Sequence, residues 1–146
     1  MMKVFSGMVV VLAIFMVSMP LQAAQKTITS KDDEKLVTLN IGDKLVIKLP
    51  GNYTTGYQWE VIKGYDDDII RQEGKGEYKP EKTDRVGAGG TAIFTFTAVG
   101  TGRTDLNMEY KRPWEKNGDV PEDFEITVLV KKSKSKGKNT DIEQDD

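Results

Sequence analysis

Apolar and polar residues alternate with a period of two along most of the chain between residues 37 and 130. The alternation is clear at 37–41, 45–49, 57–61, 94–98, 106–110 and 124–130, and a weaker segment covers 69–72. Successive side chains of a β-strand point to opposite faces of a sheet, so each segment predicts a strand with one buried face. No stretch shows the 3.6-residue period of an amphipathic helix.

A sheet must cover its apolar face, and in a chain without helices the cover is a second sheet. We therefore predict an all-β fold, an immunoglobulin-like antiparallel β-sandwich of about seven strands. The 146 residues, of which 38% are hydrophobic and 30% charged, fit one globular domain. Residues 25–130 have the size of such a sandwich.

The two ends of the chain differ from this domain. A Lys and an apolar run over 4–17 precede small residues at Ala23 and Ala24, which predicts a signal peptide over 1–24 and an exported protein, periplasmic or secreted. The run is shorter than the roughly 20 residues of a spanning helix, although an uncleaved anchor stays open as an alternative. Residues 131–146 are charged, with one apolar residue, Ile142, and predict a disordered tail.

The chain contains no Cys and no His. Disulfides, thiol nucleophiles, thiolate metal sites and imidazole bases are therefore excluded, and most hydrolase mechanisms with them. A formal charge of −2 provides no basic field for nucleic acid or anionic membranes. We predict no enzyme activity, no cofactor and a monomer. Asp66, Asp67 and Asp68 are interpreted as a solvated turn, because three consecutive carboxylates are not expected to face one ion.

Three connections are long, at 50–56, 74–90 and 111–123, whereas 42–43 and 100–102 form tight turns. The alternation of strands between them predicts that the long loops meet at one end of the sandwich. Each loop carries one candidate binding segment. The candidate residues are Asn52, Tyr53, Thr54, Thr55, Gly56 and Tyr57 in the first loop, Gly87, Ala88, Gly89 and Gly90 in the second, and Arg112, Pro113 and Trp114 in the third.

The three segments differ in what their residue types predict. Small hydroxyl side chains and one glycine in the first loop form a narrow wedge, or simply a turn. The glycines of the second loop lack the Lys and the helix of a phosphate-binding loop. Trp114 follows a proline and lies among charged residues, so it is predicted to be exposed, and an exposed Trp beside Arg is typical of a binding hot spot.

Taken together and in this order, Asn-x-Thr-Thr-Gly-Tyr, Gly-x-Gly-Gly-Thr and Arg-Pro-Trp-Glu resemble the chagasin family of proteinaceous cysteine-peptidase inhibitors. The resemblance covers roughly residues 35–130. It implies a sandwich whose three loops plug the cleft of papain-like, cathepsin L-type peptidases reversibly and without covalent chemistry. Thr54, Thr55 and Gly56 would enter beside the catalytic thiol, and the other two segments would flank them.

Two residues of the wedge raise separate expectations. Tyr53 stands where the family usually has proline, which would fix φ and stiffen the loop, so Tyr53 predicts either weaker binding or a compensating aromatic contact. Asn52 begins an Asn-Tyr-Thr glycosylation pattern, and a glycan there would obstruct the wedge. The alternative function is a secreted carbohydrate-binding or adhesion module, since exposed aromatic rings on β-sandwiches also stack on sugars.

Overall fold

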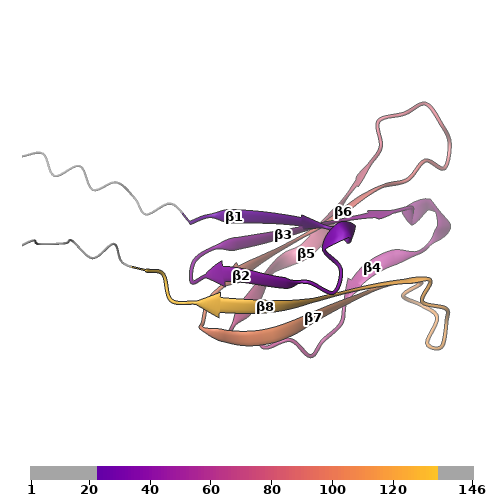
Figure 1. Cartoon of the computed structure of the whole chain (residues 1–146). Coiled ribbons are helices and arrows are strands. Elements are labelled where there is room, and N and C mark those ends of the chain that lie inside the picture. The colour runs from indigo at the N-terminus through magenta and orange to yellow at the C-terminus, as the bar shows by residue number, and fades with distance from the viewer. Residues whose placement is uncertain (1–22, 135–146) are drawn as a thin grey trace, which may run out of the picture.

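The computed structural model describes residues 23–134 as eight strands and two single-turn 3-10 helices (Figure 1). The elements are β1 (Gln25–Thr29), η1 (Ser30–Asp32), β2 (Leu36–Asn40), β3 (Lys44–Gly51), η2 (Tyr53–Thr55), β4 (Gln58–Val61), β5 (Ile70–Pro80), β6 (Gly90–Ala98), β7 (Gly102–Lys111) and β8 (Glu122–Lys131). Most of the predicted signal peptide and most of the predicted tail lie outside the described residues. Between residues 23 and 134 no helix has the length and apolarity needed to cross a bilayer.

The strands form two four-stranded sheets with the orders β1-β3-β6-β5 and β2-β8-β7-β4. The prediction of an all-β sandwich is confirmed, with eight strands instead of about seven. The prediction that it is antiparallel is wrong for two edge pairs, since β1 runs parallel to β3 and β2 runs parallel to β8. The chain crosses from one sheet to the other through η1, so β1 and β2 each pair with a strand that follows later in the sequence.

The predicted alternation produces the core between the sheets. In β6 the side chains of Ala92, Phe94, Phe96 and Ala98 are buried, while the residues between them are half-buried. The other sheet contributes buried apolar residues from β7 and β8 in the same way. The largest fully buried side chains are Phe96, Phe124, Leu39, Leu45, Ile47, Leu49, Ile70, Leu106, Met108, Ile126 and Val128.

Two strands differ from the sequence prediction. Strand β1 was not predicted, because Ile28 is its only buried residue and one apolar position makes no alternation. Strand β5 continues to Pro80, so the predicted loop over 74–90 is wrong for its first seven residues. A register shift between Glu73 and Glu77 interrupts the β5–β6 pairing. The glycines and charged residues there give this exposed edge strand no strand-like sequence pattern.

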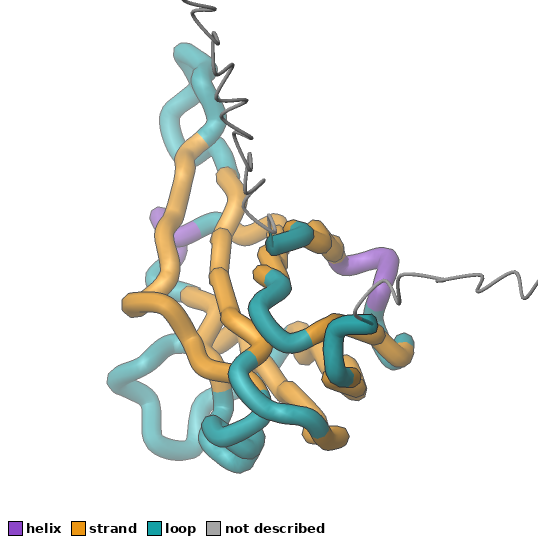
Figure 2. Tube along the Cα trace, turned by 90° about the vertical axis from the view of Figure 1, so that its left-hand side faces the viewer, coloured by secondary structure: helices purple, strands orange, loops and turns teal. Residues whose placement is uncertain are grey.

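The three long loops leave the sandwich at one end, as predicted, at the right of Figure 1. The end-on view of Figure 2 shows that the β5–β6 hairpin extends beyond the other strands, with its loop farthest out. The opposite end holds the β2–β3 and β6–β7 turns and the β4–β5 connection. The scaffold therefore places the three candidate binding segments at one end, and the two tight turns and residues 62–69 at the other.

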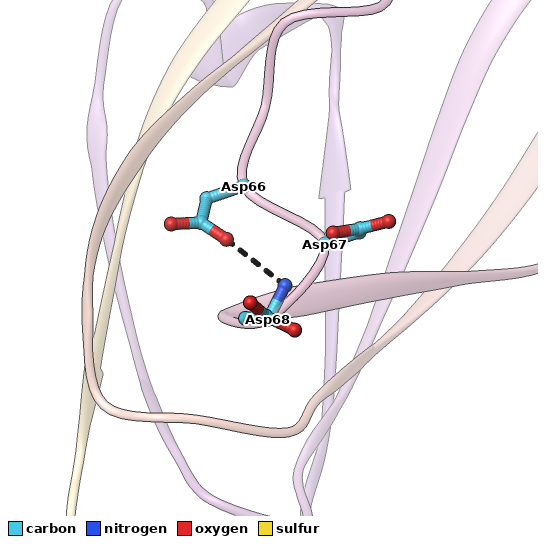
Figure 3. A group of neighbouring side chains, drawn as sticks. All are labelled: Asp66, Asp67 and Asp68. Atoms are coloured by element: carbon cyan, nitrogen blue, oxygen red, sulfur yellow. Dashed lines mark hydrogen bonds between the residues drawn. The ribbon is translucent and has the colours of Figure 1, made fainter.

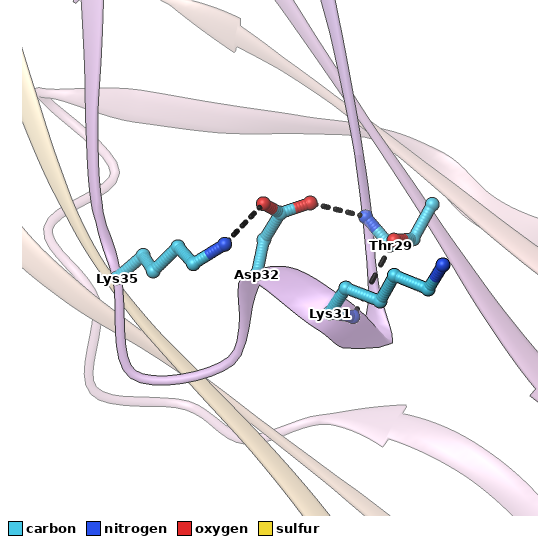
Figure 4. A network of polar contacts seen from close by, with 4 residues as sticks. All are labelled: Thr29, Lys31, Asp32 and Lys35. Carbon is cyan, nitrogen blue, oxygen red and sulfur yellow. Dashed lines mark hydrogen bonds and ion pairs between the residues drawn. The ribbon is translucent and has the colours of Figure 1, made fainter.

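A fourth connection, between β1 and β2, also lies toward the loop end but turns back earlier (Figure 1). It is closed by a capping box in which Asp32 accepts a hydrogen bond from the Thr29 backbone N–H at 2.9 Å and Thr29 Oγ1 accepts one from the Lys31 N–H (Figure 4). Lys35 Nζ lies 3.2 Å from the Asp32 carboxylate. These contacts are local, and they hold the η1 turn without the other loops.

Candidate functional site

The first loop is a short, internally bonded projection. Asn52 is the N-cap of η2, and its Oδ1 accepts hydrogen bonds from the Thr54 N–H at 3.2 Å and from Thr54 Oγ1 at 2.6 Å. Thr55 Oγ1 donates to the Asn52 carbonyl at 2.6 Å. Gly56 ends the turn in the left-handed region with φ of 85°, which favours glycine. Thr54 and Thr55 are exposed, and with Gly56 they form a tip that we call the wedge.

The second loop is joined to the first by a hydrogen bond. Asn52 Nδ2 donates to the Gly87 carbonyl at 2.9 Å, so both ends of the Asn52 amide are engaged within the protein. The same Nδ2 is the atom that would carry a glycan. Of the predicted residues in this loop, Gly87 is exposed and Ala88 and Gly89 are half-buried, whereas Gly90 is buried as the first residue of β6.

The third loop covers the other side of the wedge. A Cβ placed on Gly56 would lie 2.5 Å from Cη2 of Trp114, so the indole ring packs directly on the glycine. Trp114 is nevertheless 66% exposed, and Pro113 beside it is also exposed. The guanidinium carbon of Arg112 lies 4.5 Å from the centroid of the Tyr57 ring, a cation–π contact between the two loops.

Arg112 is itself held in place, because its Nη1 lies 3.3 Å from Glu115 Oε1. The third loop therefore contacts the first through one aromatic ring and one cation. The three loops form one surface, which we call the loop face: the wedge with residues 86–89 on one side and 112–114 on the other.

An aromatic cluster lies beneath the wedge. The rings of Tyr53 and Tyr78 are stacked at 4.0 Å between centroids and 5° between planes. Tyr110 packs at 5.3 Å from Trp59 and 5.5 Å from Tyr57. Burial raises the pKa of the Tyr53 phenol above its ordinary value of 10.0. Tyr53 therefore makes its aromatic contact within the protein itself.

Sequence reasoning missed three residues of this region. Val86 is fully exposed next to Gly87, and an apolar residue in a loop that is otherwise charged was an available signal. Tyr110 and Tyr78 are half-buried strand residues. The alternation over 106–110 indicates that Tyr110 packs but not which loop it contacts, and Tyr78 lies in the part of β5 that has no alternation.

Asp66, Asp67 and Asp68 lie at the opposite end of the sandwich, in the β4–β5 connection (Figure 3). One oxygen from each carboxylate lies within 4.8 Å of the others, so the expectation that the three cannot approach one point is wrong. All three side chains are exposed, and Asp66 Oδ1 accepts a hydrogen bond from the Asp68 N–H at 2.9 Å. This hydrogen bond is typical of a solvated turn, and we assign no ion to the three carboxylates.

Residues 38–128 match the model of the chagasin family peptidase inhibitor I42, which covers more than half of the chain. The chain belongs to the chagasin family. It is 31% identical to chagasin of Trypanosoma cruzi over 108 residues, which are 71% of this chain and 94% of that protein. The similarity to amoebiasin-2 of Entamoeba histolytica is 26% over 109 residues, 75% of this chain and 88% of the relative.

The fold of the chagasin family is found again among solved structures. The crystal structure of the cysteine protease inhibitor EhICP2 from Entamoeba histolytica superposes with a TM-score of 0.66 at 24% identity, over 75% of this chain and 97% of that one. The resemblance drawn from the three loop motifs is confirmed, and so is the prediction of a peptidase inhibitor rather than an enzyme.

Proposed function

We propose that the loop face inserts into the active-site cleft of papain-like cysteine peptidases of the cathepsin L type and blocks it reversibly, without covalent chemistry. The observation that carries this proposal is the wedge of Thr54, Thr55 and Gly56, in which both threonines are exposed and which two other loops hold from both sides. The name of EhICP2, a cysteine protease inhibitor with the same fold, supports the choice of enzyme class.

The wedge is suited to occupy a cleft without being cleaved. Proteases bind the cleaved segment of a substrate in an extended conformation, whereas Tyr53–Thr55 form a 3-10 turn. The Asn52 carbonyl already accepts hydrogen bonds from Thr55 Oγ1 and Tyr110 Oη, and the Tyr53 carbonyl accepts one from the Gly56 N–H at 3.1 Å. These peptide groups are therefore not free to adopt the geometry of a substrate.

The flanking loops supply contact area on either side. Trp114 and Arg112 are of the residue types that dominate binding energy at protein interfaces. Val86 adds a fully exposed apolar side chain on the other flank. Because most of the face is fixed before the enzyme arrives, little conformational entropy is lost on binding.

Titration of papain with the purified protein tests this function. We expect stoichiometric loss of peptidase activity, recovery of activity on dilution, and binding to papain whose thiol has been blocked by methylation. Trypsin, a serine peptidase, serves as the control and should stay active. Absence of papain inhibition at micromolar concentrations would refute the proposal.

We also propose that the protein is exported and begins at Ala24. The Ala24 nitrogen lies 3.2 Å from Asp43 Oδ1, and its carbonyl accepts a hydrogen bond from the Lys44 N–H at 2.9 Å. Cleavage after Ala23 would place the new terminal ammonium beside a carboxylate, whereas cleavage after Ala24 would remove both contacts. The intact mass of the protein recovered from the periplasm or medium distinguishes the two sites, and a cytoplasmic, unprocessed chain would contradict export.

A further inference from the structure

The side chain of Tyr53 points away from the exposed part of its loop. Its ring stacks on Tyr78 of β5, and its hydroxyl accepts a hydrogen bond from the Trp59 N–H at 3.1 Å. Thr54 and Thr55, the next two residues, are exposed. Tyr53 therefore contacts the sandwich, and the wedge projects from the other side of the turn.

The Tyr78 phenol occupies space that is available because residue 90 is a glycine. A Cβ on Gly90 would lie 2.6 Å from Tyr78 Oη, so the absence of a side chain there admits the phenol. Tyr78 Oη lies 3.3 Å from the Gly51 carbonyl, to which it donates, and 3.5 Å from the Tyr53 nitrogen. The same Cβ would also collide with the backbone carbonyl of Lys79, so glycine at position 90 admits both the β5 backbone and the Tyr78 phenol.

Tyr110 fixes the other side of the turn. Its hydroxyl accepts a hydrogen bond from the Asn52 N–H at 2.8 Å and donates to the Asn52 carbonyl at 3.2 Å. Asn52 is the N-cap of η2, so both peptide groups at the start of the turn are bonded to a strand of the opposite sheet. The turn is held from β5 in one sheet and from β7 in the other.

We propose that Tyr53, Tyr78 and Tyr110, the tyrosine lock, are positioning residues that set the wedge in its inhibitory conformation without touching the peptidase. This inference rests on the proposed function. A 3-10 turn of three residues has little stability by itself. Without the lock the wedge would have to be ordered by the enzyme, at the expense of affinity.

The backbone at Tyr53 offers a direct test, because proline fits there. Tyr53 is the first residue of η2, a position that proline favours since its φ is already helical. Asn52 before it is extended, with φ of −124° and ψ of 92°, and so lies outside the α region that is disfavoured for a residue preceding proline. Within residues 23–134 the Tyr53 N–H donates only to Tyr78 Oη, at 3.5 Å, so little hydrogen bonding is lost.

The experiment compares papain inhibition by the parent with that by Tyr53→Ala, Tyr53→Pro and Tyr65→Ala. Tyr65 is a matched control, a half-buried tyrosine that packs edge-on against Phe96 far from the loop face. Tyr53→Ala is expected to weaken inhibition about tenfold or more. Tyr53→Pro lacks the same ring but keeps the turn stiff, so it should recover most of the loss, and Tyr65→Ala should inhibit like the parent.

Amide hydrogen exchange of the free protein provides a second readout that needs no peptidase. Residues 54–57 should exchange faster in Tyr53→Ala than in the parent and in Tyr53→Pro. Unchanged exchange in Tyr53→Ala, or inhibition by Tyr53→Pro no better than by Tyr53→Ala, would overturn the lock. If the parent itself fails to inhibit papain, the proposed function fails, and the exchange rates still decide whether the lock exists.

Discussion

The two ends of this sandwich are built from similar residue types but are held together differently. At the turn end, most hydrogen bonds that close the connections join backbone groups, such as the Asp43 N–H to the Asn40 carbonyl at 3.0 Å and the Gly42 N–H to the Ala98 carbonyl at 2.8 Å. At the loop end, side chains from distant strands brace the backbone, as Tyr110 does at Asn52, 58 residues away in sequence. Long-range bracing lets a loop project and still keep one shape, which a short turn cannot do.

This difference has a consequence for stability and affinity. Side chains at the loop end divide into those that hold the loops and those that remain exposed on the face, such as Thr54 and Trp114. A substitution at the turn end should change the free energy of unfolding alone. A substitution on the loop face should change affinity for the peptidase with little change in stability.

The largest expected effect comes from comparing Gly56→Ala with Gly42→Ala. Both glycines have φ in the left-handed region, 85° and 93°, so each substitution should cost about 1–2 kcal/mol of stability. Only the Cβ at Gly56 meets Trp114, while the one at Gly42 meets nothing within 4 Å. Gly56→Ala should therefore also weaken papain inhibition about a hundredfold.

Denaturant unfolding and papain titration of the two variants separate the effects. Equal losses of stability with unequal losses of inhibition are expected. If Gly42→Ala weakens inhibition as much as Gly56→Ala does, the two ends are not independent and the comparison fails.

Trp114→Ala should have a smaller effect, confined to affinity. Because the indole is 66% exposed, its removal should change the free energy of unfolding by less than about 0.5 kcal/mol. Loss of a hot-spot side chain should weaken papain inhibition by about 2 kcal/mol, or about thirtyfold. Leu36→Ala, which removes an apolar residue that is 55% exposed on β2, is the matched control and should inhibit normally. Equal inhibition by Trp114→Ala and the parent would remove the third loop from the contact surface.

Much of the scaffold could be predicted from the sequence, because burial of one sheet face requires alternation. The same reasoning failed for strands that bury only one residue or whose pairing is interrupted. Strand β1 buries Ile28 alone, and β5 contains a bulge beside Gly76, whose Cβ would collide with the Phe94 ring. Neither feature leaves an alternating pattern, so both strands depend on partners elsewhere in the sheet.

The composition of the loops predicted which segments form the face but not which way each side chain points. Tyr53 has both an apolar ring and a hydroxyl, so its residue type fits an interface and a core equally well. Its inward direction is decided by Tyr78, 25 residues later, and by the space at Gly90. Such a contact requires knowledge of the strand register, which the sequence pattern does not contain.

The smallest effect is expected at the β1–β2 connection, which lies toward the loop end without reaching the face. The Thr29 N–H, and after it Lys35, hold the pKa of Asp32 below its usual value of 3.8. A lowered folded-state pKa means that this stabilisation is fully present above the unfolded value and is lost as the pH falls through the folded value. Asp32→Asn should therefore reduce the free energy of unfolding by about 1 kcal/mol or less at neutral pH, which is the size of other capping contacts at helix N-termini.

The pH dependence distinguishes a charged cap from general packing. The difference between Asp32→Asn and the parent in denaturant unfolding should be constant at neutral pH and should shrink toward zero in acid, while papain inhibition stays unchanged. Because Asp32 bonds only to Thr29 and Lys35 among the described residues, its loss leaves the contacts between the three loops intact. A loss of inhibition in Asp32→Asn would mean that a residue can affect inhibition merely by lying toward the loop end. The bracing contacts instead indicate that a residue must contact the loop face to do so.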